Sequence, residues 1–332
     1  MSESKEARTC LIVGAGISGL LAGEALQRGG WNVTVLDKGR GVGGRMATRR
    51  VGGGTFDHGA QFFTVRGERF SDLVEGWLEA GAAAEWSRGF ADAEGTPNED
   101  GHPRFRGADG MTSIPKYLAE NLDVRTGERA VRADAGEAGW EVVCESGLRL
   151  GASALLLAMP VPQALDLATS GNYGLPAGSR QQLEAVSYDP CLALMVLLDG
   201  PAEVPGRGGM QIKGEPLDWI GDNRRKGISH VPAITIHAGP EWSGAHFDDE
   251  EADIARHLIS FAGDRLGTDL SSLVVDSSLA RWRYSWVTES HPEPFLVAPG
   301  DPTLLFCGDA FGQPKVEGAA LSGLAAADYL LG

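Results

Sequence analysis

The sequence predicts an α/β fold in which both ends of the chain contribute to one parallel sheet and the middle forms a second, inserted domain. The apolar runs at 9–13 and 302–309 both stop at glycine, which is typical of buried parallel strands. Apolar residues at helical spacing fill 17–30, and a second strand pattern follows at 32–36. This strand–helix–strand unit and the last strand are expected to share a sheet.

The middle of the chain predicts a mixed α+β domain. Helical patterns cover 68–81, 110–122 and 248–267, and strand patterns cover 129–157, 191–200, 233–239 and 278–287. The polar segment 93–105 is predicted to be a loop.

Composition argues against several classes of protein. The formal net charge of −16 over 332 residues makes the chain a poor general binder of nucleic acid or of an anionic membrane. Its four cysteines are far apart and form no Cys/His cluster, so we predict no metal site and expect free thiols in a reducing compartment. The polar first residues and the lack of an apolar run of about 20 residues favour a cytoplasmic protein.

A glycine motif between the first strand and the first helix predicts a Rossmann-like dinucleotide site. Gly14, Gly16 and Gly19 form G-x-G-x-x-G, and Asp37 ends the second strand 18 residues later. Such glycines allow a tight turn, a close approach to a pyrophosphate and close helix packing, while the acid accepts hydrogen bonds from a ribose. A chance Gly-rich turn is the alternative, and NAD and FAD both fit this motif.

A second Gly-rich loop at 41–45 favours FAD. It follows the ribose acid directly and ends in Arg45, which can neutralise a pyrophosphate through forked hydrogen bonds. A solvated basic loop is the alternative.

The segment 308–323 predicts a contact with the other end of the cofactor. Asp309 follows a strand and suits ribityl hydroxyls, and the helix starting near Val316 would direct free N–H groups at the flavin ring. Gly318 and Ala319 would leave room for the ring. A plain Ala-rich packing helix is the alternative.

These three segments together resemble the FAD-binding amine-oxidase superfamily. Other segments resemble the bacterial branch of the renalase family: "FDHGAQFFTVR" (56–66), "GADGMTSIPKYLA" (107–119), "LLLAMPVPQAL" (155–165), "AGPEWSGAHF" (238–247) and "RWRYSW" (281–286). The resemblance runs from about residue 9 to the end of the sequence.

The resemblance implies a glutathione-reductase-type FAD domain with an inserted substrate domain and noncovalent FAD between them. We expect the FAD domain to comprise 1–67, 123–160 and 298–332, and the substrate domain to comprise 68–122 and 161–297. The residues expected to contact FAD are Gly14, Gly16, Ile17, Ser18, Gly19, Asp37, Lys38, Gly44, Arg45, Met46, Gly59, Ala60, Gln61, Gly308, Asp309, Val316, Glu317, Gly318 and Ala319.

The implied activity is that of renalases, which oxidise 2- or 6-dihydroNAD(P) to NAD(P)+ by hydride transfer to flavin N5 and reduce O2 to H2O2. The lysine that monoamine oxidases place near the flavin has no located counterpart. Cys307 should point into its strand, so no cysteine suits covalent attachment. Phe62 and Phe63 stand where the family often carries Tyr.

Candidates for the substrate side are less distinctive. Asn223 lies beside three cations and would bind a nicotinamide carboxamide, while a neighbouring Arg or Lys binds a substrate phosphate. A solvated turn is the alternative. Trp282, Tyr284 and Trp286 share one strand face, and Trp286 would form a wall of the ring slot unless the face serves packing. His246 and Gln61 are further candidate contacts, although a surface or capping role for His246 is equally open.

The main hypothesis is a monomeric FAD oxidase of dihydronicotinamide dinucleotides. A flavin amine oxidase or desaturase on the same fold is one alternative. A protein that binds FAD or NAD without turnover is another, from a different class.

Overall fold

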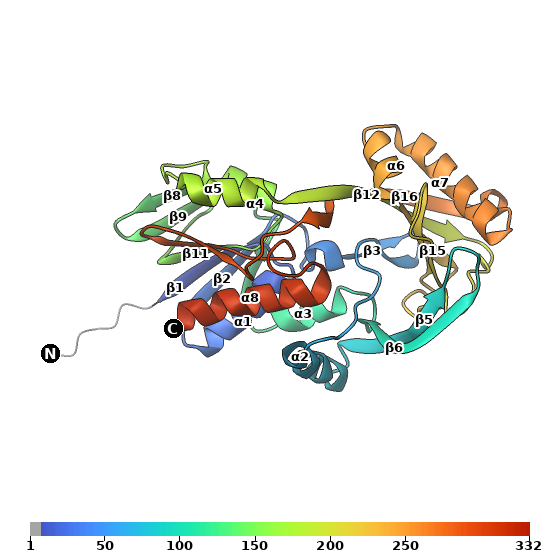
Figure 1. Ribbon diagram of the computed structural model, residues 1–332, viewed down its shortest axis with the longest axis horizontal. Helices are drawn as coiled ribbons and strands as arrows, with labels where there is room; N and C mark the ends of the chain where they lie inside the picture. The colour runs from blue at the N-terminus through green and yellow to red at the C-terminus, as the bar shows by residue number, and fades with distance from the viewer. Residues whose placement is uncertain (1–7) are drawn as a thin grey trace. The chain divides into compact units, whose positions relative to one another are not determined.

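The computed structural model describes residues 8–332, and the chain divides into two units of dense internal contact (Figure 1). Unit 1 contains the segment ending at Gly44, Pro115–Ser187 and Val287–Gly332. Unit 2 contains Arg45–Ile114 and Tyr188–Trp286. Residues 1–7, which the expected FAD domain includes, lie outside the described residues.

Unit 1 is built on a six-stranded sheet in the order β17-β18-β11-β1-β2-β7. Its strands are β1 (Thr9–Val13), β2 (Asn32–Asp37), β7 (Asp123–Thr126), β11 (Ala154–Leu157), β17 (Leu296–Ala298) and β18 (Thr303–Phe306). All neighbours pair in parallel except β17 and β18. The first and last predicted strands therefore share one sheet, in which β11 separates β1 from β18.

Helices and a small antiparallel sheet complete unit 1. The helices are α1 (Ile17–Arg28), α3 (Ser113–Ala119, which starts in unit 2), α4 (Val161–Ala168), α5 (Ala177–Glu184) and α8 (Lys315–Leu331). The small sheet contains β8 (Ala130–Gly136), β9 (Gly139–Cys144) and β10 (Arg149–Ala152).

Helices α1 and α8 pack side by side (Figure 1). A Cβ on Gly323 would lie 2.1 Å from the carbonyl oxygen of Ser18 in α1, so only glycine permits this approach. Small residues in α8 are thus explained in part by helix packing.

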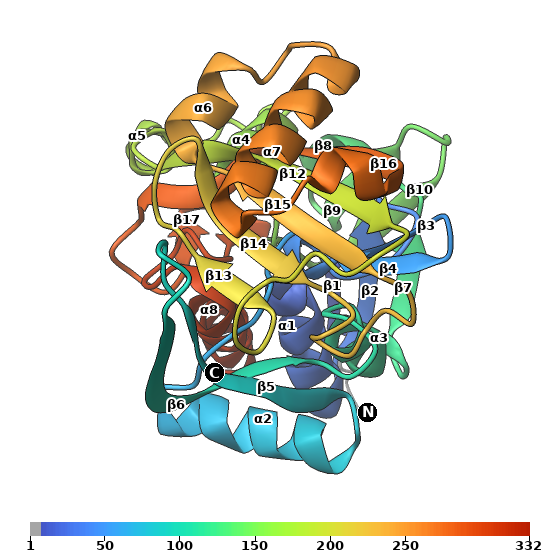
Figure 2. The same cartoon turned by 90° about the vertical axis from the view of Figure 1, so that its right-hand side faces the viewer.

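Unit 2 is built on a mixed seven-stranded sheet in the order β16-β12-β15-β14-β13-β5-β6 (Figure 2). Its strands are β5 (Ala83–Ala91), β6 (Pro97–Gly107), β12 (Ser187–Leu198), β13 (Gly209–Gln211), β14 (Leu217–Asp222), β15 (Ala233–Ala238) and β16 (Val274–Glu289). β13 and β5 pair in parallel, whereas the pairs β12–β15, β13–β14, β14–β15 and β5–β6 are antiparallel.

Unit 2 also carries a hairpin, three α-helices and two 3-10 turns. These are β3 (Thr48–Val51), β4 (Gly54–Asp57), α2 (Glu68–Glu79), α6 (Pro240–Ala245), α7 (Glu251–Leu266), η1 (Gly44–Met46) and η2 (Leu270–Leu273). The apolar side of α7 lies against the sheet, where Ile254 and Leu258 join a buried cluster with Leu194 and Ile236 (Figure 2).

The predicted fold class is confirmed by this architecture, but one predicted element is wrong. The polar segment 93–105 was expected to be a loop, whereas β6 occupies much of it and pairs with β5. Most of β6 is exposed, so its sequence does not alternate between apolar and polar residues. A search for that alternation therefore could not detect the strand.

The units also differ from the expected domain ranges. Residues 45–67 lie in unit 2, because the β3–β4 hairpin contacts β15 there. Residues 161–187 lie in unit 1, where α4 contacts β8. The segments 115–122 and 287–297 also lie in unit 1.

No helix among residues 8–332 combines the length and the apolar character needed to cross a membrane.

Candidate cofactor and substrate site

The first glycine motif leaves an open, uncapped helix start in unit 1. Gly14 has φ +117°, and a Cβ there would lie 2.4 Å from the carbonyl oxygen of Ala158. Gly16 is the N-cap residue of α1, and a Cβ there would meet no atom of the described chain within 4 Å. Because glycine has no capping side chain, the first N–H groups of α1 remain available to an anion in front of Gly16.

Asp37 is held in place by backbone donors at the end of β2. Its Oδ2 accepts a hydrogen bond from Ala15 N at 2.7 Å, and its Oδ1 accepts one from Gly39 N at 2.7 Å. Each carboxylate oxygen keeps a further lone pair, so the group can also accept ribose hydroxyls. Lys38 instead donates to Gln163 Oε1 at 2.8 Å, and burial lowers the pKa of its ammonium group.

The second Gly-rich loop lies beside the first. Gly43 N donates to Ala15 O at 2.8 Å, and a Cβ on Gly44 would lie 3.6 Å from the Cα of Gly16. Two glycine-rich backbones therefore border the same region of unit 1, as a pyrophosphate site requires.

The loop before α8 forms a second open place in unit 1. Gly308 has φ +139°, and a Cβ there would meet nothing within 4 Å in the described chain. Its N–H donates to Ser322 Oγ at 2.8 Å. A Cβ on Gly318 would lie 1.6 Å from Gln313 O, so this glycine also makes room for the loop itself. Pro314 is the N-cap residue of α8 and has no capping side chain, which leaves N–H groups for a ligand.

The remaining predicted contacts in unit 1 belong to the same two segments of the chain, and their contacts with FAD stay predictions. Ile17 and Ser18 are buried in the first turn of α1, and Gly19 packs against Gly14, where a Cβ would lie 2.1 Å from the Gly14 oxygen. Val316 and Ala319 are buried in α8. Asp309 and Glu317 are partly exposed.

The turn from Asp57 to Gln61 in unit 2 lies directly against Arg45. Ala60 N donates to Arg45 O at 2.8 Å, and a Cβ on Gly59 would lie 2.0 Å from the same oxygen. The guanidinium of Arg45 donates to Tyr284 O at 3.1 Å. Met46 is buried beside this segment.

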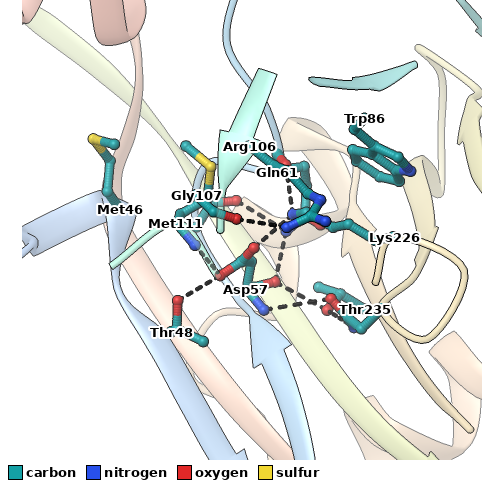
Figure 3. A network of polar contacts seen from close by, with 12 residues as sticks. Met46, Thr48, Asp57, Gln61, Trp86, Arg106, Gly107, Met111, Lys226 and Thr235 are labelled. Atoms are coloured by element: carbon teal, nitrogen blue, oxygen red, sulfur yellow. Dashed lines mark hydrogen bonds and ion pairs between the residues drawn. The ribbon is translucent and has the colours of Figure 1, made fainter. Parts of the chain in front are cut away.

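A buried ion pair anchors this turn (Figure 3). Lys226 Nζ lies 2.6 Å from Asp57 Oδ2, and the two side chains are 1% and 0% exposed. Asp57 Oδ1 accepts hydrogen bonds from Met111 N at 2.8 Å and Thr48 Oγ1 at 2.5 Å. Burial lowers the pKa of Lys226, while the charge of Asp57 opposes this shift. Sequence analysis missed the pair because its members are 169 residues apart.

Two buried histidines, one within the turn and one beside it, were also missed. Burial lowers the pKa of His58 to about 4 and that of His237 to about 3, so both are uncharged at neutral pH. Gln61 Nε2 lies 3.4 Å from His237 Nε2. Among the described residues, His58 Nδ1 and Gln61 Oε1 are buried polar atoms without a hydrogen-bond partner, which marks them as candidate ligand contacts.

The predicted substrate residues occupy varied positions. Asn223 is buried, donating to Thr235 Oγ1 at 2.9 Å and accepting from Asp57 N at 3.4 Å. His246 lies on the surface, where its Nδ1 is 2.7 Å from Asp249 Oδ2. Trp286 is 41% exposed. Substrate contacts by these three residues stay predictions.

Trp282 lies closest to the turn among the aromatic residues of β16. Its Nε1 donates to His58 O at 2.7 Å, and its ring stacks on the His58 ring at 5.2 Å between centroids. Tyr284 packs edge-on against Tyr188. Trp282, which belongs to the same period-two pattern, therefore contacts this turn, and the role of Trp286 in the ring slot stays a prediction.

Comparison with known proteins decides the family. Residues 88–331 match the family described as flavin containing amine oxidoreductase, and residues 12–77 match an NAD(P)-binding Rossmann-like domain. This chain belongs to the flavin containing amine oxidoreductases. It is an oxidoreductase of this family, and its cofactor is FAD.

Similarity to a renalase extends along most of the chain. Mouse renalase is 26% identical over 320 residues, which cover 88% of this chain and 92% of the renalase. This match and the family match confirm the predicted resemblance. Among solved structures, wild-type putrescine oxidase (TM-score 0.75, 16% identity) and cyclohexylamine oxidase from Brevibacterium oxydans IH-35A (TM-score 0.76, 13% identity) each cover 98% of this chain and 99% of their own. At these identities they show the fold alone.

The residues of the chain fit FAD. Open space in front of Gly16, at the uncapped start of α1, suits a pyrophosphate, and the oriented carboxylate of Asp37 suits a ribose. Open space at Gly308, before the uncapped start of α8, suits the flavin end of the cofactor.

Proposed function

We propose that this protein oxidises isomeric dihydronicotinamide dinucleotides (2-/6-dihydroNAD(P)) to NAD(P)+, with O2 reduced to H2O2. The observation that carries the proposal is the similarity to renalase, which spans 92% of the renalase chain. Bound FAD supplies the acceptor for a hydride and passes the electrons to O2.

The chemistry of the turn in unit 2 supports this proposal. A dihydropyridine is already electron-rich, so its oxidation needs positioning and exclusion of water more than a general base. His58 and His237 are uncharged at neutral pH, and Lys226 is neutralised by Asp57. Uncharged imidazoles would not repel a nicotinamide ring that becomes cationic.

Gln61 is the predicted substrate contact that this geometry favours most. Its Nε2 is fixed by Asp57 O at 2.6 Å and Gly59 O at 3.1 Å, which leaves the buried Oε1 to accept a hydrogen bond from a ligand. A carboxamide N–H of the substrate is the donor we propose.

We further propose that FAD is held without a covalent bond and that the protein acts as a cytoplasmic monomer. All four cysteines are free and buried, and burial raises the pKa of Cys307 to about 12, which disfavours the nucleophilic thiolate. Light scattering on the purified holoenzyme tests the monomer.

Anaerobic stopped-flow mixing tests the activity. Rapid bleaching of the flavin by 2- or 6-dihydroNAD(P), but not by amines, is the expected result, followed by H2O2 formation when air is admitted. Bleaching by an amine would favour an amine oxidase instead. Tight binding of either ligand with no bleaching would favour a non-catalytic FAD protein.

A further inference from the structure

The Asp57–Gln61 turn leaves strand β4 at Asp57 and has no regular secondary structure from His58 to Gln61, yet side chains hold most of its carbonyl groups. Thr235 Oγ1 and Gln61 Nε2 donate to Asp57 O, Trp282 Nε1 donates to His58 O, and Gln61 Nε2 also donates to Gly59 O. The carbonyl of Gln61 accepts from Lys226 Nζ at 2.5 Å. Lys226 is therefore the charged residue in this set of donors.

The ammonium group of Lys226 is itself fixed from several sides (Figure 3). Asp57 Oδ2 lies 2.6 Å away, and the ring of Trp86 lies 4.8 Å from Nζ. Met111 and Thr48 hold the opposite carboxylate oxygen. The position of the Gln61 carbonyl is thus set by a chain of contacts that reaches four separate segments of unit 2.

Stability alone is a weak reason for such a pair. Burying two charges carries a large desolvation cost, and well-packed uncharged replacements are often equally stable. A charge-assisted hydrogen bond to a turn carbonyl does provide a defined geometry.

We propose that Lys226 is a positioning residue that fixes the Gln61 end of the turn and so holds the Gly59–Gln61 backbone ready for FAD. The inference rests on the predicted contact of Gly59, Ala60 and Gln61 with FAD and not on the substrate of the proposed function. A failure of dihydronicotinamide oxidation would therefore leave it standing.

Flavin release from the holoenzyme tests the proposal. The variants are Lys226→Met, the double variant Asp57→Asn/Lys226→Met, and Lys213→Met as a control at an exposed lysine of the same unit. Each is assayed for melting temperature and for the rate at which flavin fluorescence appears on dilution.

Lys226→Met leaves Asp57 charged and unpaired, so we expect a lower melting temperature and at least tenfold faster flavin release. The double variant removes both charges and keeps an amide oxygen to accept from Met111 N–H. We expect its melting temperature to recover while flavin release stays at least tenfold faster than in the natural protein. The control should match the natural protein in both measurements.

The double variant keeps the test decisive if Lys226→Met alone fails to fold. Flavin release that returns to the natural rate together with the melting temperature would show that Lys226 only balances a charge, and the proposal would be overturned. An unchanged flavin release rate in Lys226→Met would overturn it as well.

Discussion

Substituting Gly16 and Gly14 by alanine should separate cofactor binding from folding. Both glycines belong to the same six-residue motif, but their surroundings differ. A Cβ on Gly16 meets nothing within 4 Å in the described chain, and its φ of −79° and ψ of 176° are ordinary for alanine. A Cβ on Gly14 would lie 2.4 Å from the backbone oxygen of Ala158, at a φ of +117°.

The expected magnitudes follow from these contacts. Gly16→Ala should leave the free energy of unfolding unchanged or raise it by up to about 1 kcal/mol, because alanine restricts the unfolded chain. Gly14→Ala combines a strained backbone, at about 1–3 kcal/mol, with a clash that requires Ala158 to move, so we expect a loss of about 3 kcal/mol or more. At about 2 °C per kcal/mol, the melting temperature should fall by about 6 °C or more.

Gly16→Ala, which should leave the stability of the fold intact, is expected to weaken the binding of FAD. The new methyl of Gly16→Ala occupies the open space in front of α1, so the FAD dissociation constant should rise by about tenfold or more, equivalent to about 1.4 kcal/mol. Thermal unfolding of the apoprotein and titration with FAD measure the two effects separately. Natural FAD affinity in Gly16→Ala would refute the assignment of the pyrophosphate to this place, and natural stability in Gly14→Ala would refute the steric argument at Ala158.

Three further predictions concern acid stability, one hydrogen bond and cofactor attachment. Burial lowers the pKa of His58 to about 4 and that of His237 to about 3. Below about pH 6.5 these histidines therefore bind protons in the unfolded chain but not in the folded chain, so the free energy of unfolding should fall as the pH falls from 6.5 toward 4. An unfolded histidine is half protonated at pH 6.5, so each of the two should contribute a loss of about 1.6 kcal/mol between pH 6.5 and 5, or about 3 kcal/mol together. His237→Gln should remove about half of this loss in urea unfolding; an equally steep pH dependence in the variant would contradict the assignment. Trp282→Phe deletes the N–H that donates to His58 O at 2.7 Å and should cost about 1–2 kcal/mol in the same assay, whereas Trp286→Phe at an exposed ring should cost less than about 0.5; equal costs would argue against a structural role for the indole N–H. Acid precipitation should release all FAD into solution from the natural protein and from Cys307→Ser alike, and yellow colour retained in the natural precipitate alone would indicate a covalent bond to that cysteine.

The sequence was most informative where a local backbone requirement dictates the residue. Gly14 and Gly19 are needed for contacts with their immediate neighbours along the first strand and helix, so their spacing between a strand and a helix predicted a dinucleotide site. The second Gly-rich loop at 41–45 was needed to favour FAD over NAD. The strand β6 was missed for the opposite reason, since its exposed polar residues carry no periodic signal and only pairing with β5 makes it a strand.

The candidate site in unit 2 was harder to predict because its contacts join distant segments. Asp57 and Lys226 are 169 residues apart, and Lys226 sits in a run of cations that resembles a solvated turn. Two local features could have drawn attention to the pair. Asp57 follows the apolar residue Phe56, which is buried, and Lys226 precedes Gly227 in a tight turn. The cations beside Asn223 led to the prediction that it binds a ligand, which stays a prediction. The structure adds that its amide hydrogen-bonds to Asp57 N and Thr235 Oγ1.

The neighbours of β11 in the unit 1 sheet have a consequence for biosynthesis. β1 and β18 pair with its two edges, and α8 packs on α1, although nearly 300 residues of translation separate these partners. Every strand of the unit 2 sheet leaves the ribosome before β18 and α8 do. The inserted unit can therefore fold first on the nascent polypeptide. Until β18 and α8 are synthesised, the apolar surfaces of β1 and α1 lack their partners, and we expect a chaperone to shield them.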